Sequence, residues 1–573
     1  MSRKLIDNAR RRLAAETGCQ HNPWGGRLSV ALVYPNTYHQ AMSNLGFLSI
    51  YHLLNSRSDT LCERFFLPDP GDLAEHRKTG YPLFSLESGR PLRDFDLIAF
   101  SISFEGDYLH LPTLFELGRL PLFAADRGPG DPLLLCGGVC AFLNPEPLAE
   151  IMDLFAVGEG EVILPGLLRA LIDGGERDGL LQRLGRLPGV YVPSLYRLEY
   201  HPDGTLAAQP PLGSAPARVR RQWLADLDTA ASRSFVQTAE TEFGDMALTE
   251  VSRGCSRGCR FCAAGYIYLP LRERSLENLV EQIETGLCQR SKVGLVGAAV
   301  SDYPQIEELN QEILQRGGKI SVASLRIDAL TAAEVAALKA SGHRTVALAP
   351  EAGSQRMRDL INKNLDTEQI LQAVQLLAAG DIPNLKLYFL IGLPGETEAD
   401  LAEMLELVNQ IRQVWLEEGR RRGRLGTITL SVNPFIPKPF TPFQWAGMEP
   451  EKTLNAKLQG LRKAIARLGN TELICESLRS AQLQALLSRG DRRIARLLPE
   501  LAAGQNLKAA CRSLGLDPDF FITRERGPEE LFPWEILDSG VARDYLWREY
   551  RRGLAGQTTL PCQPGCQRCG VCG

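Results

Sequence analysis

The stretch "EVSRGCSRGCRFCAAGY" (residues 250–266) places three cysteines, Cys255, Cys259 and Cys262, within eight residues. They follow "MALTEV" (246–251), an apolar segment that predicts a buried strand. Three thiolates on one loop can hold a [4Fe-4S] cluster and leave one iron open, whereas a closed structural zinc site takes four ligands. The spacing therefore favours a catalytic cluster. Three cysteines holding zinc with a distant fourth ligand is the alternative.

Further apolar segments alternate with amphipathic helices after this loop, which is typical of a parallel β/α fold. With the first strand they make six, too few to close an eight-stranded barrel, so we expect a partial (β/α)6 barrel over residues 246–450. Its chemistry should lie at the carboxyl ends of the strands. The further segments are "VGLVGAAVSD" (293–302), "KISVASLRID" (319–328), "RTVALAPEAGS" (344–354), "NLKLYFLIGLPGE" (384–396) and "TITLSVNPFIPKPF" (427–440).

An earlier series of strands predicts a doubly wound, Rossmann-like parallel sheet over residues 26–175, with a ligand crevice at the strand ends. The strands are expected in "LSVALVYP" (28–35), "FDLIAFSIS" (95–103), "PLLLCGG" (132–138) and "MDLFAVGEGE" (152–161). The rest of the α/β chain is predicted as an N-terminal arm (1–25), a connecting segment (176–245), a helical region (451–555) and a cysteine-rich tail (556–573).

Composition indicates a globular, cytoplasmic chain. The 573 residues are 44% hydrophobic and 23% charged, and the net charge of -4 gives no overall bias towards nucleic acid or an anionic membrane. The amino terminus is charged, and no apolar run approaches the ~20 residues that cross a bilayer. Fourteen cysteines in such a chain are better explained as metal or redox ligands than as disulfides.

The tail "CQPGCQRCGVCG" (562–573) holds four more clustered cysteines. Its compact spacing is closer to that of ferredoxins than to zinc ribbons, which separate two pairs by a longer loop. A second [4Fe-4S] cluster, a zinc ion and free thiols all remain open. The four cysteines are Cys562, Cys566, Cys569 and Cys572.

"CSRGCRFC" (255–262), with Phe261 before its last cysteine, resembles the CxxxCxxC motif of the radical S-adenosylmethionine superfamily. The resemblance implies that the open iron binds S-adenosylmethionine and that one electron cleaves it to methionine and a 5′-deoxyadenosyl radical. It also implies contacts to this cofactor at later strand ends. These are Gly297 to the methionyl amine, Ser324 and Arg326 to ribose and carboxylate, Glu351 to ribose, and Ile391 and Gly392 to adenine.

The domain order and "CGGVCAFLNPEPLAEIMDLFAVGEGE" (136–161), "LSRGDRR" (487–493) and "CGVC" (569–572) resemble a family of radical proteins with a cobalamin-binding domain and no assigned substrate. The resemblance implies cobalamin as a further cofactor, with Gly137 and Gly138 close to it, and Gly158 and Gly160 recur at the next strand end. The cobalt-ligating DxHxxG motif is absent. "EYHPDG" (199–204) reads as a hairpin turn, and the neighbours of His39 do not match the motif.

Three functions follow as expectations. The first is a radical enzyme acting on an unidentified substrate, by methyl transfer if cobalamin binds. The second is a methylthiotransferase acting on tRNA or protein, since "SVNPFIPKPFTPFQW" (431–445) and "TGCQHN" (17–22) resemble segments of that group. The third is a non-catalytic cobalamin or redox-binding protein. Expected partners are the substrate, an electron donor such as flavodoxin or ferredoxin, and a partner-domain protein; nucleic acid stays open, and no membrane is expected.

Overall fold

The computed structural model describes residues 2–322, 325–563 and 565–572. The chain divides into two compact units. The N-terminal unit comprises Met1–Asp245, Leu486–Pro518 and Glu529–Gly540, and the barrel unit comprises Met246–Ala485, Asp519–Pro528 and Val541–Gly573. The division falls inside two helices, α17 (Leu478–Arg489) and α20 (Pro518–Ile522).

The N-terminal unit is built on a six-stranded sheet in the order β2-β1-β3-β4-β5-β6. All neighbours are parallel except β5 and β6. The order of the first five strands is that of a doubly wound sheet, which places its ligand crevice at the carboxyl ends of β1 and β3. The strands are β1 (Leu28–Tyr34), β2 (Thr60–Phe66), β3 (Leu97–Ser101), β4 (Leu133–Gly137), β5 (Leu154–Ala156) and β6 (Val190–Tyr191).

The strands of this sheet are almost continuously apolar because helices cover both faces. From Val30 to Tyr34, every residue of β1 is buried. The longer helices of the unit are α1 (Arg3–Ala14), α3 (Leu45–Asn55), α4 (Pro70–Thr79), α5 (Leu111–Gly118), α7 (Gly160–Ile172) and α8 (Arg177–Leu184). The shorter ones are α2 (Tyr38–Met42), α6 (Val139–Leu143), α18 (Leu498–Ala502) and α19 (Leu507–Ser513).

The connecting segment contributes β6 to the main sheet and also forms a hairpin of β7 (Glu199–Tyr200) and β8 (Leu206–Ala208). The His201 N–H donates to the Thr205 carbonyl oxygen across the turn, at 2.8 Å. "EYHPDG" is therefore a hairpin turn, as predicted. A short pair joins β9 (Val219–Arg220) to β19 (Leu537–Asp538) in the same unit.

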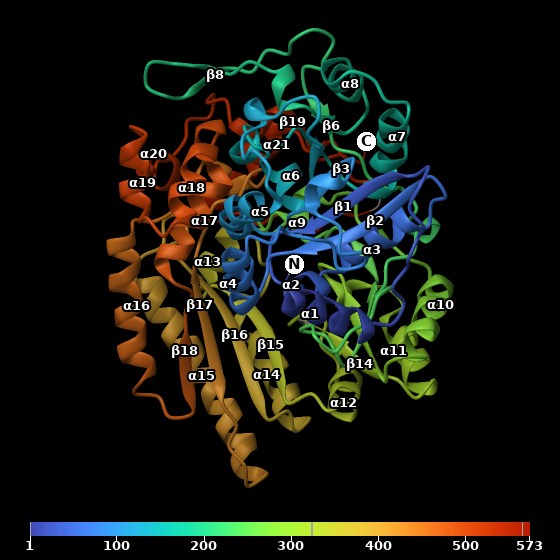
Figure 1. Ribbon diagram of the computed structural model, residues 1–573. Helices are drawn as coiled ribbons and strands as arrows, with labels where there is room; N and C mark the ends of the chain where they lie inside the picture. The colour runs from blue at the N-terminus through green and yellow to red at the C-terminus, as the bar shows by residue number, and fades with distance from the viewer. Residues whose placement is uncertain (1, 323–324, 564, 573) are drawn as a thin grey trace. The chain divides into compact units, whose positions relative to one another are not determined.

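The barrel unit holds a three-stranded and a four-stranded sheet, both parallel. The first contains β10 (Ala247–Glu250), β13 (Lys292–Val296) and β14 (Lys319–Val322). The second contains β15 (Thr345–Glu351), β16 (Asn384–Ile391), β17 (Ile428–Pro434) and β18 (Thr471–Ile474), which lie side by side in Figure 1. An antiparallel pair, β11 (Ser252–Arg253) and β12 (Arg272–Glu273), flanks the cysteine loop.

These strands confirm the predicted parallel α/β architecture, with one correction. β18 adds a seventh parallel strand in a region that we expected to be helical. It has four residues, and two of them are exposed. So short an edge strand carries no periodic pattern that sequence can reveal.

Several helices of the barrel unit begin at residues whose side chains accept from their free N–H groups. Ser275 caps α10 by accepting from Asn278 N, and Thr331 with Glu334 forms a capping box on α12. Asp366 with Gln369 does the same on α14. The helices are α9 (Ala264–Ile267), α10 (Leu276–Leu287), α11 (Ile306–Gln315), α12 (Ala332–Ala340), α13 (Gln355–Leu360), α14 (Thr367–Ala379), α15 (Glu398–Arg421), α16 (Glu451–Ile465) and α21 (Arg543–Leu554).

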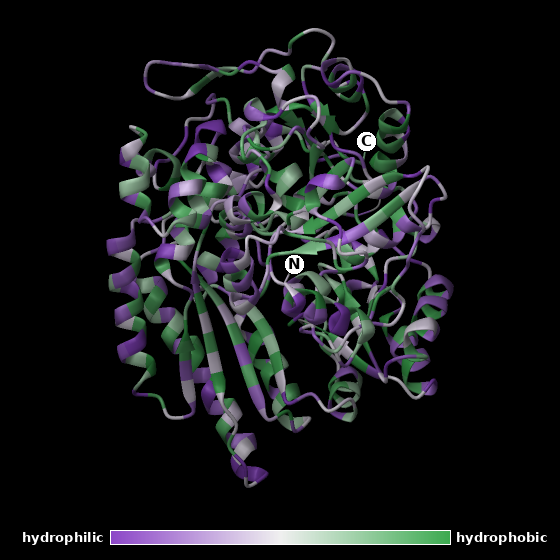
Figure 2. Cartoon of the chain, viewed as in Figure 1, coloured by the Kyte–Doolittle hydropathy of each residue, from purple (hydrophilic) through white to green (hydrophobic). Residues whose placement is uncertain are grey.

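One face of each barrel strand packs on these helices. Strand β16 alternates half-buried and buried residues along its length, and Figure 2 shows the matching alternation of polar and apolar bands on the neighbouring strands. An apolar cluster joins β13 to α10 and α11. Leu279, Leu295 and Leu309 are fully or almost fully buried in it. Among the described residues, every helix is too short or too polar to span a bilayer.

Candidate active site

The loop that carries Cys255, Cys259 and Cys262 follows β10 and β11, at the carboxyl end of the first barrel strand. Two glycines give it its path. Gly254 has φ +94°, and a Cβ there would lie 2.8 Å from the Tyr268 carbonyl oxygen, so only glycine fits. Gly258 has φ +69° and lets the chain reverse between the first two cysteines. The third cysteine directly precedes α9.

Arg260, between the second and third cysteines, anchors the loop to the rest of the barrel unit. Its side chain is fully buried and forms an ion pair with Glu549 on α21, 3.0 Å from Nη2 to Oε2. The same guanidinium donates to the Asp359 and Leu360 carbonyl oxygens at 3.0 Å and to the Gln557 carbonyl oxygen at 2.8 Å. These partners hold the buried Arg260 side chain, and with it the cysteine loop, in one position.

Asn362 is a second anchor. It adopts φ +56° directly after α13, is 1% exposed, and donates through Nδ2 to the Gly258 carbonyl oxygen at 3.1 Å. The Tyr266 hydroxyl donates to the same oxygen at 3.1 Å. The loop is thus held in place by side chains from α13 and α9 before any metal binds.

The three thiols face a strongly desolvating environment. Burial raises the pKa of all three thiols, that of Cys259 to about 12. A negatively charged neighbouring side chain raises the pKa of each thiol further. Lys363 lowers the pKa of Cys259 and of Cys262 because its ammonium group is close by. A metal centre would replace the protons, because thiolates are the ligating form.

Lys363 forms a half-buried ion pair with Glu351, 3.5 Å from Nζ to Oε1. Glu351 ends β15 at a register shift in its pairing with β16 and has φ +65°. Burial raises the pKa of Glu351, and Lys363 opposes that rise. Burial disfavours the charged form of Lys363, yet Glu351 raises its pKa overall. Irregular backbone of this kind at a strand end is often found next to active sites.

The residues present fit a [4Fe-4S] cluster better than a single ion. Within the described parts of the chain, no group of three or more cysteine, histidine or carboxylate side chains is arranged to hold one metal ion. A cluster places each cysteine sulfur on a different iron, so its thiolates stand further apart than those around one ion. Cys255, Cys259 and Cys262 would hold the cluster, and it would supply a low-potential electron.

The other predicted cofactor contacts on the first sheet have partners within the protein. Gly297 follows β13, and a Cβ there would lie 3.0 Å from Ser252 Oγ. Arg326 pairs with Asp302 and Asp328. Arg257 of the cysteine loop also donates to Asp302, at 2.8 Å from Nε to Oδ2. Arg326 therefore belongs to a network of arginines and aspartates near the loop. Ser324 lies outside the described residues.

On the second sheet, Glu351 lies beside the cysteines as described, whereas Ile391 and Gly392 end β16. Ile391 is fully buried and accepts from Phe435 N at 2.8 Å. Gly392 has φ +75° and donates its N–H to Glu396 Oε2 at 2.8 Å. The turn at this strand end is thus well ordered. The structure does not test their contact with adenine.

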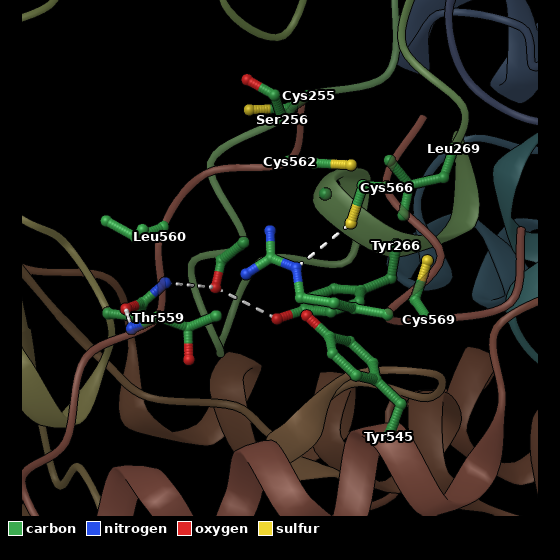
Figure 3. A pocket seen from close by; sticks show the side chains of 14 residues that line it. Cys255, Ser256, Tyr266, Leu269, Tyr545, Thr559, Leu560, Cys562, Cys566 and Cys569 are labelled. Carbon is green, nitrogen blue, oxygen red and sulfur yellow. Dashed lines mark hydrogen bonds between the residues drawn. The ribbon is translucent and has the colours of Figure 1, made fainter. Parts of the chain in front are cut away.

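The cysteine tail lies against the cysteine loop, in the same unit. Cys255, Cys562, Cys566 and Cys569 line one small cavity, which Figure 3 shows from close by. The Cys562 N–H donates to the Ser256 carbonyl oxygen at 2.7 Å. Two cysteine clusters separated by about half the chain are therefore neighbours.

The predicted cobalamin contacts at the N-terminal sheet have a different explanation. Gly138 has φ +92°, and a Cβ there would lie 2.5 Å from the Ile102 carbonyl oxygen. A Cβ on Gly158 would lie 2.0 Å from the Gln222 carbonyl oxygen. The close approach of the chain's own backbone explains why both positions are glycine. Their contact with cobalamin stays a prediction. Gly137 makes only ordinary contacts, and His39 lies half-buried on α2, just beyond β1.

Sequence reasoning missed Lys363, Arg260 and Asn362. Arg260 stands inside the cysteine motif, but nothing in its spacing indicates that its partner is Glu549. Asn362 and Lys363 follow α13 in "INKN" (361–364), which reads as an ordinary polar turn. Only their contacts show that they face the loop. Asn362 donates to the Gly258 carbonyl oxygen, and the Lys363 ammonium group lowers the pKa of Cys259 and of Cys262.

Two family models match the chain. Residues 46–193 match radical SAM proteins, N-terminal, and residues 249–408 match the radical SAM superfamily. The second match contains the cysteine loop and the first five predicted barrel strands. The two matches thus assign residues 46–193 and 249–408 to radical SAM proteins. A match to this superfamily implies a [4Fe-4S] cluster and S-adenosylmethionine as cofactors.

Among similar proteins, "Uncharacterized protein MJ0966" of Methanocaldococcus jannaschii is 28% identical over 82% of this chain and 90% of its own length. The anaerobic magnesium-protoporphyrin IX monomethyl ester cyclase of Rubrivivax gelatinosus is 25% identical over 53% of each chain. The tRNA-2-methylthio-N(6)-dimethylallyladenosine synthase of Anaplasma phagocytophilum is 24% identical over 39% of this chain and 51% of its own. The chain thus spans about half the length of these two enzymes.

A solved structure of the cobalamin-dependent S-adenosylmethionine radical enzyme OxsB, with aqua-cobalamin and S-adenosylmethionine bound, has a TM-score of 0.43 and 16% identity to this chain. The match covers 69% of this chain and 56% of OxsB.

Proposed function

We propose that this radical SAM enzyme cleaves S-adenosylmethionine reductively at the cluster held by Cys255, Cys259 and Cys262, and uses the product radical on a C–H bond of its substrate. The observation that carries the proposal is the position of the three thiols on a preformed loop at the carboxyl end of β10. Cys255, Cys259 and Cys262 would hold the cluster, which would supply one electron for cleavage of the sulfonium carbon–sulfur bond to methionine and a 5′-deoxyadenosyl radical.

The protein's own residues hold and enclose this centre. Arg260 and Asn362 fix the loop, so the geometry is in place before the cofactors bind. Lys363 places a positive charge beside two of the thiols and favours their thiolate form. Glu351 keeps that ammonium group in position. The electron would come from a low-potential donor such as flavodoxin or ferredoxin, which we propose as a partner.

Anaerobic purification and reconstitution test this function. We expect iron and sulfide in the protein and, with a strong reductant, conversion of S-adenosylmethionine to methionine and 5′-deoxyadenosine. Cys259→Ala should abolish the conversion, whereas Cys288→Ala, at an exposed cysteine outside both clusters, should not. A protein with an intact cluster that leaves S-adenosylmethionine uncleaved would be a redox-binding protein instead.

Sulfur or methylthio transfer is a second candidate, favoured by the tail cysteines beside the loop. Cys562 and Cys255 line the same cavity, so a sulfur-bearing group on the tail would lie close to the site where the radical forms. A relative named as a methylthio-tRNA synthase supports this candidate. Products that carry a methylthio group after incubation with transfer RNA or ribosomal protein would favour it, and methylated or cyclised products would exclude it.

Cobalamin on the N-terminal sheet stays a prediction. The β2-β1-β3-β4-β5 strand order supports it because such sheets bind ligands at their carboxyl edge. The close packing at Gly138 and Gly158 explains these glycines without it, so we assign no step to cobalamin. Reconstitution with hydroxocobalamin followed by an absorption spectrum tests binding. His39→Ala should leave that spectrum unchanged, and loss of a histidine-ligand signal would contradict this.

A further inference from the structure

The residues that lead into the cysteine tail form hydrogen bonds with the residues that hold the cysteine loop in place. Thr559 donates its N–H to Asn362 Oδ1 at 2.7 Å and its hydroxyl to Glu549 at 2.9 Å. Asn364 donates to the Thr559 carbonyl oxygen at 3.3 Å. Since Asn362 also holds Gly258 and Glu549 also holds Arg260, the tail and the loop share both anchors.

Beyond Thr559 the tail has almost no apolar core to order it. Leu560 is 79% exposed, and only Cys569 among the four cysteines is buried, at 5%. The Cys569 carbonyl oxygen accepts from Ala542 N at 2.8 Å, which brings the tail back to the start of α21. A segment so short and polar is not held by the hydrophobic effect alone.

Three of the tail cysteines lie around the same space. Cys562, Cys566 and Cys569 all line the small cavity that Cys255 also lines. Arg568 donates from Nε to the Cys566 sulfur at 3.1 Å and from Nη2 to the Pro561 carbonyl oxygen at 2.9 Å. Rotation about the Cα–Cβ bond repositions a thiol without moving the main chain.

We propose that the tail holds a second metal centre, an iron–sulfur cluster or a zinc ion, with Cys562, Cys566, Cys569 and Cys572 as its ligands. Binding of this centre orders the tail along one side of the cavity that Cys255 also lines. Metal-binding free energy then serves as the folding free energy of the tail. The second centre covers the Cys255 side of the loop and stands next to the first cluster. The site rests on its own residues and does not depend on the proposed reaction.

Metal analysis of the full-length protein, purified and kept anaerobic, tests the proposal. Cys566→Ser with Cys569→Ser should remove one cluster's worth of iron and sulfide, or one zinc per chain, and should leave the metal of the loop in place. The matched control is Cys288→Ser with Cys475→Ser, at two cysteines outside both clusters. Loss of iron identifies a cluster and loss of zinc identifies zinc. Unchanged iron, sulfide and zinc in the double variant would overturn the proposal.

Limited proteolysis gives a second readout that does not use activity. With its centre in place the tail should resist cleavage between residues 556 and 573, and in the Cys566→Ser, Cys569→Ser protein it should be cut rapidly. A tail that stays equally protected without its metal would show that the Thr559 clamp alone orders it, against the proposal. Cys259→Ala separates the two ideas, because it should remove the loop cluster and leave the tail metal bound.

Discussion

The backbone N–H of Cys562 donates to the carbonyl oxygen of Ser256, one residue after Cys255, at 2.7 Å. This bond joins the first cysteine of the tail to the loop that carries the other cluster. The cavity between them is also lined by Tyr545 of α21 (Figure 3). The tail and the loop therefore line the same cavity.

Replacing any one of Cys255, Cys259 and Cys262 with alanine should remove the loop cluster. No other described cysteine outside the tail lines this cavity, and the tail thiols have their own arrangement. We expect iron to fall by one cluster's worth and reductive cleavage of S-adenosylmethionine to disappear. Iron and sulfide analysis with chromatographic assay of 5′-deoxyadenosine measures both. Wild-type cleavage rates in any of the three variants would contradict the assignment.

Arg260→Met should destabilise the barrel unit and loosen the tail. The substitution removes the buried cation of Glu549 and leaves the exposed Arg552, 3.6 Å from Nε to Oε1, so the cost should stay below the ~3–5 kcal/mol of a fully unpaired buried charge. The melting temperature should drop, and cleavage by protease after residue 555 should accelerate. Combining Arg260→Met with Glu549→Leu should recover part of the stability, because neither charge is then left unpaired. A double variant as unstable as the single one would mean that the carbonyl contacts of Arg260 dominate.

Asp400 should make the barrel unit sensitive to acid. It caps α15 and pairs with Arg356, and it accepts from Ser354 and Thr397. Burial opposes its charge, but these hydrogen bonds hold its pKa below the ordinary range. A depressed aspartate pKa stabilises the fold above the unfolded value of about 3.9 and loses that contribution as the pH falls below it.

The check is the melting temperature of wild-type protein against Asp400→Asn as a function of pH. The wild-type advantage should be constant near neutrality and shrink below about pH 4. An advantage that grows on acidification would show that the sign is wrong.

Gly138→Ala and Gly158→Ala should each destabilise the N-terminal unit. The new methyl group would meet the Ile102 or Gln222 carbonyl oxygen at 2.5 or 2.0 Å, and both glycines have positive φ. Gly166→Ala is the control, because it lies within α7 and has no neighbouring atom within 4 Å. It should be neutral or slightly stabilising. Melting temperatures decide the matter, and unchanged stability in Gly158→Ala would contradict the packing explanation.

Much of the architecture could be predicted from the sequence. Buried parallel strands read as apolar runs, and the amphipathic segments between them read as helices, so the parallel α/β architecture of both units was predictable. The hairpin at "EYHPDG" was predictable from its turn residues. β18 was not, because four residues at a sheet edge give too little pattern.

The candidate site, like the fold, could be predicted from the sequence only in part. The spacing of Cys255, Cys259 and Cys262 is a local property, so the sequence by itself determined the cluster-binding motif and, through it, the class of chemistry. The sequence also determined that a second set of thiols exists, but neither its metal nor its neighbours.

Only the tertiary structure decided which residues surround the motif. Glu549 pairs with Arg260 from 289 positions away, and Cys562 meets Ser256 because α21 returns the chain to the loop. The glycines at Gly138 and Gly158, which the sequence alone suggested for a cofactor, proved to face backbone of the same chain. Such contacts join residues far apart in the chain, and the free energy that selects them depends on burial and hydrogen bonding in three dimensions, which no local pattern records.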